Sequence, residues 1–266
     1  MTDQRAAYLQ AIGIDTWVQR TTHAPSQMPA PEPPQVSRVE PLQVPDAASP
    51  QVPAAARAPD AEPIRVLRAD VQPVPAGDVA SLDWQALESA VSACTRCSLH
   101  TSRTQTVFGV GARNAQLLVI GEAPGADEDR QGEPFVGRAG QLLNAMLRAI
   151  GLAREEVFIA NILKCRPPGN RDPKHEESAA CTPFLQRQIA LLQPRAVLAL
   201  GRISAQWLLQ SELPVGRLRG EMQVLNPWGL PLVVSYHPAY LLRSPAAKAK
   251  AWQDLLRIKA VLNDKP

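Results

Sequence analysis

From Leu82 onward, short continuous apolar runs alternate with segments in which apolar residues recur at helical spacing. The apolar runs predict buried strands at 115–120, 157–160, 196–200 and 232–234. The periodic segments predict helices at 82–93, 140–150, 176–192, 203–209 and 248–262. Strands and helices that alternate in this way favour an α/β fold, with a central, mostly parallel sheet flanked by helices on both faces.

The N-terminal part of the chain does not show this alternation. Half of the 26 prolines lie between Pro25 and Pro75, and residues 21–80 repeat Pro, Ala, Gln and Val with few aromatic side chains. Such a segment buries too little apolar surface to offset the entropy of ordering, so we expect a disordered linker. Before it, residues 6–20 place apolar side chains at roughly helical spacing. We therefore expect a short amphipathic docking peptide in 1–20, the linker in 21–80 and one folded domain in 81–266.

Charge and hydropathy narrow the partners of this chain. Residues 1–80 are net acidic and residues 81–266 net basic, which makes the folded part compatible with a polyanion such as DNA. No apolar stretch is long enough to cross a membrane, and the first residues lack the pattern of a signal peptide. We expect a monomeric cytoplasmic protein without a membrane partner. Disulfides are rare in that reducing compartment, so the cysteines point to metal ligation instead.

The four cysteines are Cys94, Cys97, Cys165 and Cys181, a C-x2-C pair followed at a distance by C-x15-C. Four thiolates suit either a structural zinc ion or a [4Fe–4S] cluster, because both accept tetrahedrally disposed sulfur ligands. The alternative is four buried free thiols, against which a C-x2-C pair with no cysteine left over argues. The spacing alone leaves the metal open.

Three polar loops follow directly after predicted strands. They read GEAPGADEDRQGEPFVG from Gly121, NILKCRPPGNRDP from Asn161 and HPAYLLRSP from His237. Ligands of open α/β sheets bind outside the carboxyl ends of the strands. We therefore expect these three loops to converge on one site.

The first two loops carry side chains that suit an unpaired nucleobase. Gly121 lets a ligand approach the backbone closely, and the acidic residues 127–129 precede Phe135, which we expect to be an exposed ring for base stacking. The Asn161 side chain offers a donor and an acceptor together, which matches the pairing edge of uracil and mismatches that of cytosine. Taken singly, each feature is as typical of an ordinary turn.

The third loop adds a histidine and apolar residues that could act as a wedge. His237 could donate a hydrogen bond to a base oxygen on which negative charge develops. Leu241 and Leu242 suit insertion into a base stack, and Arg243 suits a phosphate. The alternative for this segment is the first turn of a helix.

Together these motifs resemble those of the family 4 uracil-DNA glycosylases, the iron–sulfur branch of their superfamily. The resemblance extends over about 82–262 and includes GEAPGADEDRQGEPFVGRAGQLL, NILKCRPPGNRDP and HPAYLLR in the family's order, together with the cysteine spacing. It implies the fold of that superfamily and a monofunctional enzyme. Such an enzyme flips uracil out of DNA and hydrolyses its N-glycosidic bond, and the abasic site that remains enters base excision repair.

The resemblance also implies roles for individual residues. The four cysteines would ligate a structural [4Fe–4S] cluster. Phe135 would stack on uracil, Asn161 would read its pairing edge, and His237 would stabilise the leaving group. The residues implied to line the pocket beside them are Gly121, Glu122 and Ala123. The residues expected to contact DNA are Leu241, Leu242, Arg243, Arg166, Asn170 and Arg171.

The resemblance defines the water-activating group less well. Family 1 enzymes use an Asp at the position of Ala123, so Glu122 is the nearest carboxylate here and Glu128 the second candidate. A carboxylate at this place would also stabilise a positively charged sugar while anionic uracil leaves.

One branch of the superfamily traps uracil covalently on a histidine of an inserted Arg/His-rich loop. No such insertion lies between Asn161 and Cys181, although His175 does. We therefore expect turnover.

The stretch LQAIGIDTWVQR, from Leu9, resembles the N-terminal segment by which the psi subunit of bacterial DNA polymerase III holds the chi subunit. A short apolar helix on a flexible tether, with Trp17 for a groove, is typical of a docking peptide. The resemblance implies that residues 6–20 bind DNA polymerase III chi, at the nucleoid of a bacterial cell.

Two other functions stay open at this point. One is a noncatalytic DNA-binding or polymerase-associated module, against which Glu122, Phe135, Asn161 and His237 argue by occurring together. The other is a zinc-containing α/β hydrolase of small nucleosides, against which the linker, the basic domain and the wedge of Leu241–Arg243 argue.

Overall fold

The computed structural model describes residues 79–264. The expected docking peptide and all of the expected linker before Val79 lie outside the described residues, as do residues 265–266. Among the helices of the described part, none is both long enough and apolar enough for a membrane crossing.

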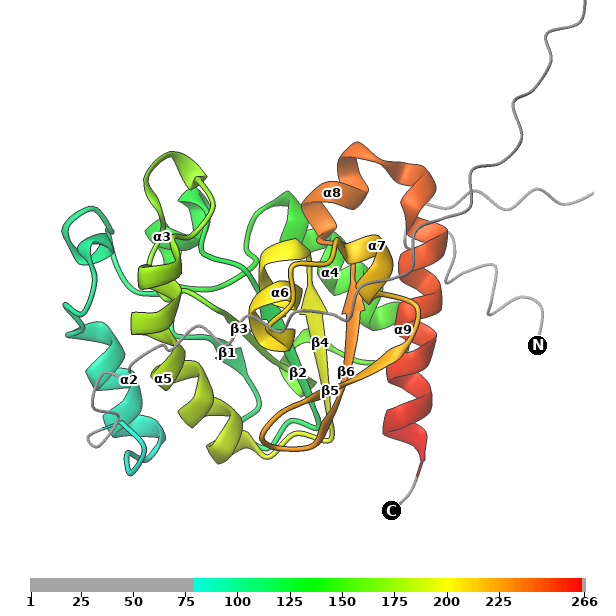
Figure 1. The fold of residues 1–266 in the computed structure, drawn as a ribbon, viewed down its shortest axis with the longest axis horizontal. Helices are drawn as coiled ribbons and strands as arrows, with labels where there is room; N and C mark the ends of the chain where they lie inside the picture. The colour runs from blue at the N-terminus through cyan, green and yellow to red at the C-terminus, as the bar shows by residue number, and fades with distance from the viewer. Residues whose placement is uncertain (1–78, 265–266) are drawn as a thin grey trace, which may run out of the picture. The chain divides into compact units, whose positions relative to one another are not determined.

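A six-stranded sheet forms the centre of the described part, in the order β1-β3-β2-β4-β6-β5 (Figure 1). The strands are β1 (Val110–Gly111), β2 (Leu117–Gly121), β3 (Phe158–Asn161), β4 (Ala196–Leu200), β5 (Met222–Leu225) and β6 (Leu230–Ser235). The four central strands run parallel, whereas β1 pairs antiparallel with β3 and β5 antiparallel with β6. The sheet is therefore mixed, with antiparallel strands only at its two edges.

Helices cover the sheet, and short 3-10 turns connect several elements. The helices are α2 (Trp84–Ser92), α3 (Ala126–Gln131), α4 (Arg138–Ala149), α5 (His175–Leu192), α6 (Arg202–Leu209), α7 (Val215–Leu218), α8 (Pro238–Arg243) and α9 (Lys248–Asn263). The 3-10 turns are Ser98–Thr101, Arg154–Glu156, Pro168–Asn170 and Pro245–Ala247.

Both faces of the sheet are buried because the central strands are apolar on both sides. On one face, Leu118 and Ile120 of β2 belong to a core shared with α2, α5, α6 and α7. On the other face, Leu117 and Val119 belong to a second core shared with α4, α8 and α9. In Figure 1, α8 (orange) lies beyond the carboxyl ends of β4 and β6, where the three polar loops are expected to form the site.

The strands and helices predicted from the apolar pattern are confirmed, with small shifts at their ends. The mostly parallel sheet flanked by helices is confirmed as well. The pattern does not predict the edge strands β1 and β5. Both are short, and Leu225 in β5 is the only buried residue in either strand. The pattern also does not predict α3, whose sequence ADEDRQ has no apolar stripe.

Candidate active site

Backbone hydrogen bonds extend the parallel pairing of β2 and β3 past the strand ends. The N–H groups of Ile162 and Leu163 donate to the carbonyls of Gly121 and Glu122, each at 3.0 Å. The loops after β2 and β3 therefore leave the sheet side by side. The loop after β6 starts at the same edge, because β6 runs parallel to β4 and β4 to β2.

A cavity of about 480 Å³ lies where the three loops meet, a size that is usual for small-ligand sites. The sequence-predicted residues that line it are Glu122, Ala123, Glu128, Phe135, Asn161, Asn170, His237 and Arg243. Among the described residues, the predicted Gly121, Arg166, Arg171, Leu241 and Leu242 do not line this cavity. The expected convergence of the three loops is confirmed.

Asn161 ends β3 with its amide group in the wall of the cavity. The residue is 3% exposed, and its Oδ1 is the one buried side-chain N or O atom in residues 79–264 without a hydrogen-bond partner. Leaving such an acceptor unpaired costs about 1–3 kcal/mol, so this oxygen is poised for a ligand. A Cβ at Gly121 would lie 2.4 Å from this Oδ1, which explains the glycine at that position.

Phe135 is 6% exposed, which corrects the expectation of an exposed ring. Its φ of 55° is uncommon for a residue with a side chain and turns the ring inward against His237. Gly140 makes this turn possible, because a Cβ there would lie 1.7 Å from the Phe135 carbonyl oxygen. Arg154 braces the loop from outside with a 2.6 Å hydrogen bond to the Pro134 carbonyl.

Both carboxylate oxygens of Glu128 accept hydrogen bonds from backbone N–H groups. Oε2 accepts from Gly125 at 3.1 Å, and Oε1 accepts from Val136 at 3.0 Å and Gly137 at 3.3 Å. Glu128 thus ties the start of the long loop to its end, immediately after Phe135. This use of both oxygens favours a positioning role over the water activation considered for Glu128 from sequence.

Glu122 lines the same cavity with a half-buried side chain that makes no hydrogen bond within residues 79–264. Burial raises the pKa of the Glu122 carboxyl, the charge of Asp172 raises it further, and the charge of Arg202 opposes both. Asp172 and Arg202 themselves form an ion pair. Glu122 is therefore the free carboxylate of the site.

His237 is the N-cap of α8. A backbone hydrogen bond and the stacked ring of Phe135 fix the orientation of its imidazole. The Ala239 N–H donates to Nδ1 at 3.2 Å, which assigns the ring proton of the neutral imidazole to Nε2. Burial lowers the pKa of His237 to about 4, with the Arg243 charge adding to the effect and that of Glu128 opposing it. At neutral pH, His237 is an uncharged hydrogen-bond donor.

The α8 helix divides the two expected wedge leucines. Leu241 is 1% exposed and packs in the core shared with α4 and α9, so its expected contact with DNA is wrong. Leu242 is 38% exposed and Tyr240 is 41% exposed. The exposed apolar pair on α8 is therefore Tyr240 and Leu242, since the helical turn points the residue between them inward. Tyr240 was not predicted from the sequence, although it precedes the two leucines directly.

Two arginine side chains hold the loop from Arg166 to Arg171, one by a bond within the loop and one by bonds to α5. Arg166 Nε donates to Asn170 Oδ1 at 2.8 Å, and Asn170 lines the cavity. Arg171 forks onto the fully buried Glu177 with hydrogen bonds of 2.9 and 2.6 Å. Arg171 therefore braces this loop against α5, whereas Arg166 bonds within the loop, and both side chains are half-buried.

All four cysteines line a second, narrower cavity between α2, α5 and the loop after β3. None of them forms a disulfide. Burial raises the pKa of the thiols of Cys97 and Cys165 and raises that of Cys181 to about 12. Within residues 79–264, no three His, Cys, Asp or Glu side chains are arranged to hold a single metal ion.

Two cations that sequence analysis missed lie against this thiol cavity. Arg103 donates to Cys165 Sγ at 3.2 Å and to the Cys94 carbonyl at 2.8 Å. Lys164 is 1% exposed, and its backbone N–H donates to Cys181 Sγ at 3.3 Å. The Lys164 ammonium donates to the Asn161 carbonyl and to Gln188 Oε1, both uncharged, so thiolates at Cys165 and Cys181 would supply the nearby anion that a buried ammonium needs. The donor set therefore fits a negatively charged, metal-bound group.

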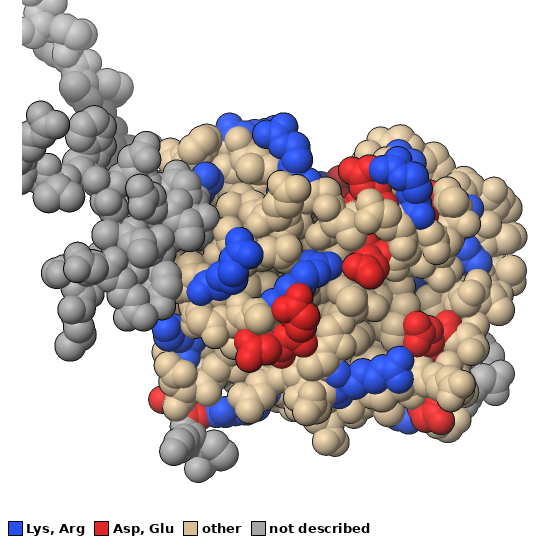
Figure 2. Space-filling view, turned by 180° about the vertical axis from the view of Figure 1, so that it is seen from behind, with Lys and Arg blue, Asp and Glu red and all other residues tan. Residues whose placement is uncertain are grey.

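The charged surface is not uniform. Figure 2 shows one face of the molecule, on which Lys and Arg side chains are interspersed with Asp and Glu. A single-sign field over that face is therefore absent. At the cavity itself, Arg243 at the end of α8 is the one Lys or Arg among the described lining residues.

Comparisons with known proteins agree with this site. A family model described as the uracil DNA glycosylase superfamily matches residues 108–256, which include the whole lining of the larger cavity. The chain is 41% identical over 174 residues to the type-4 uracil-DNA glycosylase of Archaeoglobus fulgidus, covering 63% of this chain and 87% of that protein. It is 42% identical over 180 residues to that of Pyrobaculum aerophilum, covering 65% and 92%. For that of Thermotoga maritima the identity is 43% over 159 residues, covering 58% and 80%.

Proposed function

Because this chain belongs to the uracil-DNA glycosylase superfamily and, within it, to the type-4 enzymes, we propose that it excises uracil from DNA. It is a monofunctional glycosylase, which hydrolyses the N-glycosidic bond and leaves an abasic site. Its substrate is DNA that contains uracil, and its product initiates base excision repair.

The buried, unpartnered Oδ1 of Asn161 is the observation that carries this proposal. Uracil offers an N3–H donor beside an O4 acceptor, so one amide side chain satisfies both. Cytosine offers an acceptor at N3 and a donor at N4, which leaves Asn161 mismatched. A well-made pair of this kind discriminates by about 1–3 kcal/mol.

The other side chains of the cavity divide the chemistry between them. Phe135 supplies the aromatic wall for the flipped base, and Glu128 keeps that wall in place. His237 Nε2–H donates to the uracil O2 as the C1′–N1 bond breaks and negative charge moves onto the base. A neutral imidazole suits this step because its N–H stabilises the uracil anion by a hydrogen bond, without transferring the proton to the base.

Glu122 completes the reaction on the sugar side. As the bond to N1 breaks, the sugar becomes positively charged at C1′, and the Glu122 carboxylate stabilises that charge. Water then adds to C1′ and passes its proton to Glu122. The departing uracil anion takes up a proton from solvent, so the products are uracil and an abasic sugar.

The same proposal includes a [4Fe–4S] cluster held by Cys94, Cys97, Cys165 and Cys181. The shared thiol cavity and the two cations beside it support this assignment. Four thiolates would also suit a zinc ion, and the resemblance of the cysteine spacing to that of the iron–sulfur family 4 glycosylases favours the cluster. When bound, the cluster supplies a structural link between α2, the loop after β3 and α5.

A second part of the proposal concerns residues 6–20, which lie outside the described residues. Their resemblance to the chi-binding segment of the psi subunit supports recruitment to the replication machinery. A pull-down with residues 1–25 tests it: recovery of DNA polymerase III chi is expected, and the same peptide with Trp17→Ala is the control. Recovery of no replisome subunit would remove this part.

The proposed activity is tested with a labelled oligonucleotide that carries one uracil. Incubation with excess protein, followed by alkali, should cut the strand at the uracil position. The same oligonucleotide with cytosine or thymine there should stay intact. A strand that stays intact with uracil as well would leave the noncatalytic DNA-binding module as the better account.

A further inference from the structure

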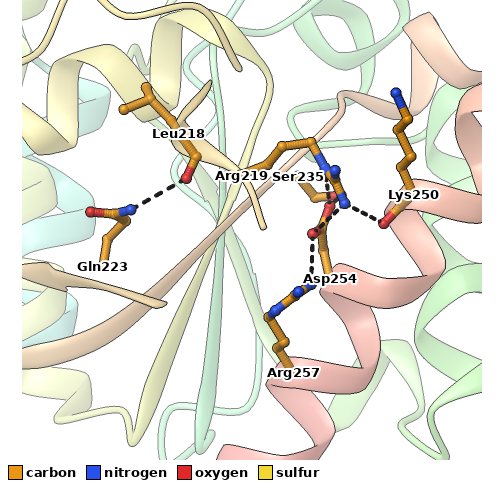
Figure 3. A network of polar contacts seen from close by, with 7 residues as sticks. All are labelled: Leu218, Arg219, Gln223, Ser235, Lys250, Asp254 and Arg257. Carbon is orange, nitrogen blue, oxygen red and sulfur yellow. Dashed lines mark hydrogen bonds and ion pairs between the residues drawn. The ribbon is translucent and has the colours of Figure 1, made fainter. Parts of the chain in front are cut away.

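A buried carboxylate behind the active site collects four hydrogen bonds. Asp254 of α9 is fully buried. It accepts from Arg219 Nε at 3.0 Å and Nη2 at 2.8 Å, from Ser235 Oγ at 3.0 Å and from Arg257 at 3.4 Å (Figure 3). Burial raises the pKa of Asp254, whereas its bonds with Arg219 and Ser235 and the nearby cations lower it. The bonded carboxylate therefore joins three separate elements.

The three elements are α9 with Asp254, the C-terminal end of α7 with Arg219, and the end of β6 with Ser235. Ser235 is the last residue of β6 and precedes His237 by two positions. Its hydroxyl binds Asp254, and its carbonyl accepts from the Gly201 N–H at 2.9 Å. A Cβ at Gly201 would in turn lie 3.0 Å from His237 Cβ. The strand end that presents His237 is thus fixed on both sides.

Arg219 extends the same network to the exposed helix α8. Its guanidinium lies over the ring of Tyr236, 5.6 Å from the centroid, and also donates to the Lys250 carbonyl at 2.7 Å. The Tyr236 ring stacks on Tyr240 with centroids 5.1 Å apart. A contiguous line of contacts therefore runs from Asp254 through Arg219 and Tyr236 to a residue that α8 exposes to solvent.

Folding alone gives little reason for this arrangement. Leu255 and Ile258 already dock α9 on the sheet, and Arg195 ties the far end of α9 through the carbonyls of Val261 and Leu262. Well-packed apolar side chains generally stabilise a fold at least as well as a buried ion pair does. The ion pair adds geometric specificity, because a bidentate pair of hydrogen bonds holds both side chains in one relative orientation.

We propose that Asp254 and Arg219 are positioning residues for uracil excision, which hold His237 at the base and α8 at the DNA. This inference rests on the proposed function. Neither side chain lines the cavity, so each acts through Ser235, Tyr236 and the backbone between them. Displacement of a catalytic group by about 1 Å can cost up to about a hundredfold in rate, which makes such support measurable.

The test compares full-length Asp254→Asn with Arg195→Gln, which loosens the other end of the same helix. Single-turnover excision is measured at saturating enzyme, at a temperature well below the melting temperature of each variant. We expect both variants to melt earlier than the wild type. Asp254→Asn should excise uracil about tenfold to a hundredfold more slowly, whereas Arg195→Gln should stay close to wild type. Equal rates for Asp254→Asn and Arg195→Gln would overturn the inference.

Two further variants keep the test decisive if Asp254→Asn folds poorly. Arg219→Met with Asp254→Leu replaces the ion pair by apolar side chains, so stability should recover while the rate stays low. Arg219→Lys keeps the charge but loses the fork, and it should weaken DNA binding as well as slow excision. If the double variant regains the wild-type rate together with stability, the role is structural only. A wild-type protein that leaves uracil in place would contradict the proposed function itself, which separates the two failures.

Discussion

His237 lies against Phe135, with ring centroids 5.5 Å apart and ring planes 28° apart. The two residues belong to loops that follow different strands, β6 and β2, and are more than a hundred positions apart in sequence. Their contact places the leaving-group donor beside the aromatic wall. It also means that the conformation of one loop depends on the other.

Glu128→Gln should destabilise the protein more than an exchange of a surface carboxylate. The three backbone N–H groups bound by Glu128 would lose a charged acceptor, which costs about 1–3 kcal/mol. Glu88→Gln, in a half-exposed pair with Arg113, should cost less than about 1 kcal/mol. Urea unfolding of both variants measures the difference. Equal midpoints would show that Glu128 does not brace the Phe135 loop.

The pH dependence of excision should identify Glu122. Its carboxylate must be ionised to stabilise the sugar cation and accept a proton, and its pKa is raised above the ordinary 4.5. The single-turnover rate should therefore fall as the pH decreases, with an inflection above that value. Asp172→Asn removes a charge that raises the Glu122 pKa, so the inflection should move to lower pH. A shift to higher pH, or none, would contradict the assignment.

His237→Ala should slow excision by a factor on the order of 10²–10³, because a hydrogen bond to the developing anion is lost. The wild-type imidazole is neutral above its pKa of about 4, so the ratio of the two rates should stay constant from neutral pH down to about pH 5. A ratio that changes near pH 6.5 would show that the imidazole is protonated in the active form. The depressed pKa also means that His237 lowers folding stability as the pH falls from about 6.5 towards 4, since the unfolded chain binds the proton first.

Asn161→Asp should weaken excision of uracil and relax the discrimination against cytosine. The substituted carboxylate loses the amide donor for uracil O4, and it can accept from the amino group of cytosine. Single-turnover rates on matched oligonucleotides with uracil or cytosine measure both effects. Unchanged kinetics and base preference would remove Asn161 from the pocket.

Lys164→Met should lower the iron content of the purified protein. Lys164 Nζ donates to Gln188 Oε1 at 2.7 Å and to the Asn161 carbonyl at 3.0 Å, and its charge lies beside Cys165 and Cys181. Loss of that charge leaves the thiolates less well compensated. Lys174→Gln, an exposed lysine of the following loop, is the control. Iron per chain and visible absorbance should fall for Lys164→Met alone, and equal iron in both variants would argue against Lys164 as a counter-charge.

The sequence predicted the central strands, the long helices and the meeting of three loops, because each depends on a local apolar pattern followed by a recognisable polar loop. It did not distinguish Leu241 from Leu242, since only the helical phase of α8 decides which side chain enters the core. It also missed Lys164 and Asp254. Their roles come from partners distant in the chain, Gln188 and Arg219, which no local pattern connects.

The most direct test of the account is single-turnover excision on an oligonucleotide with one uracil, by purified full-length protein whose iron content has been measured. We expect alkali-labile cleavage at the uracil position alone, and a large loss of rate in Glu122→Gln and His237→Ala measured beside it. Uracil-containing DNA that remains intact with iron-replete wild-type protein would contradict the assignment of this cavity to uracil excision.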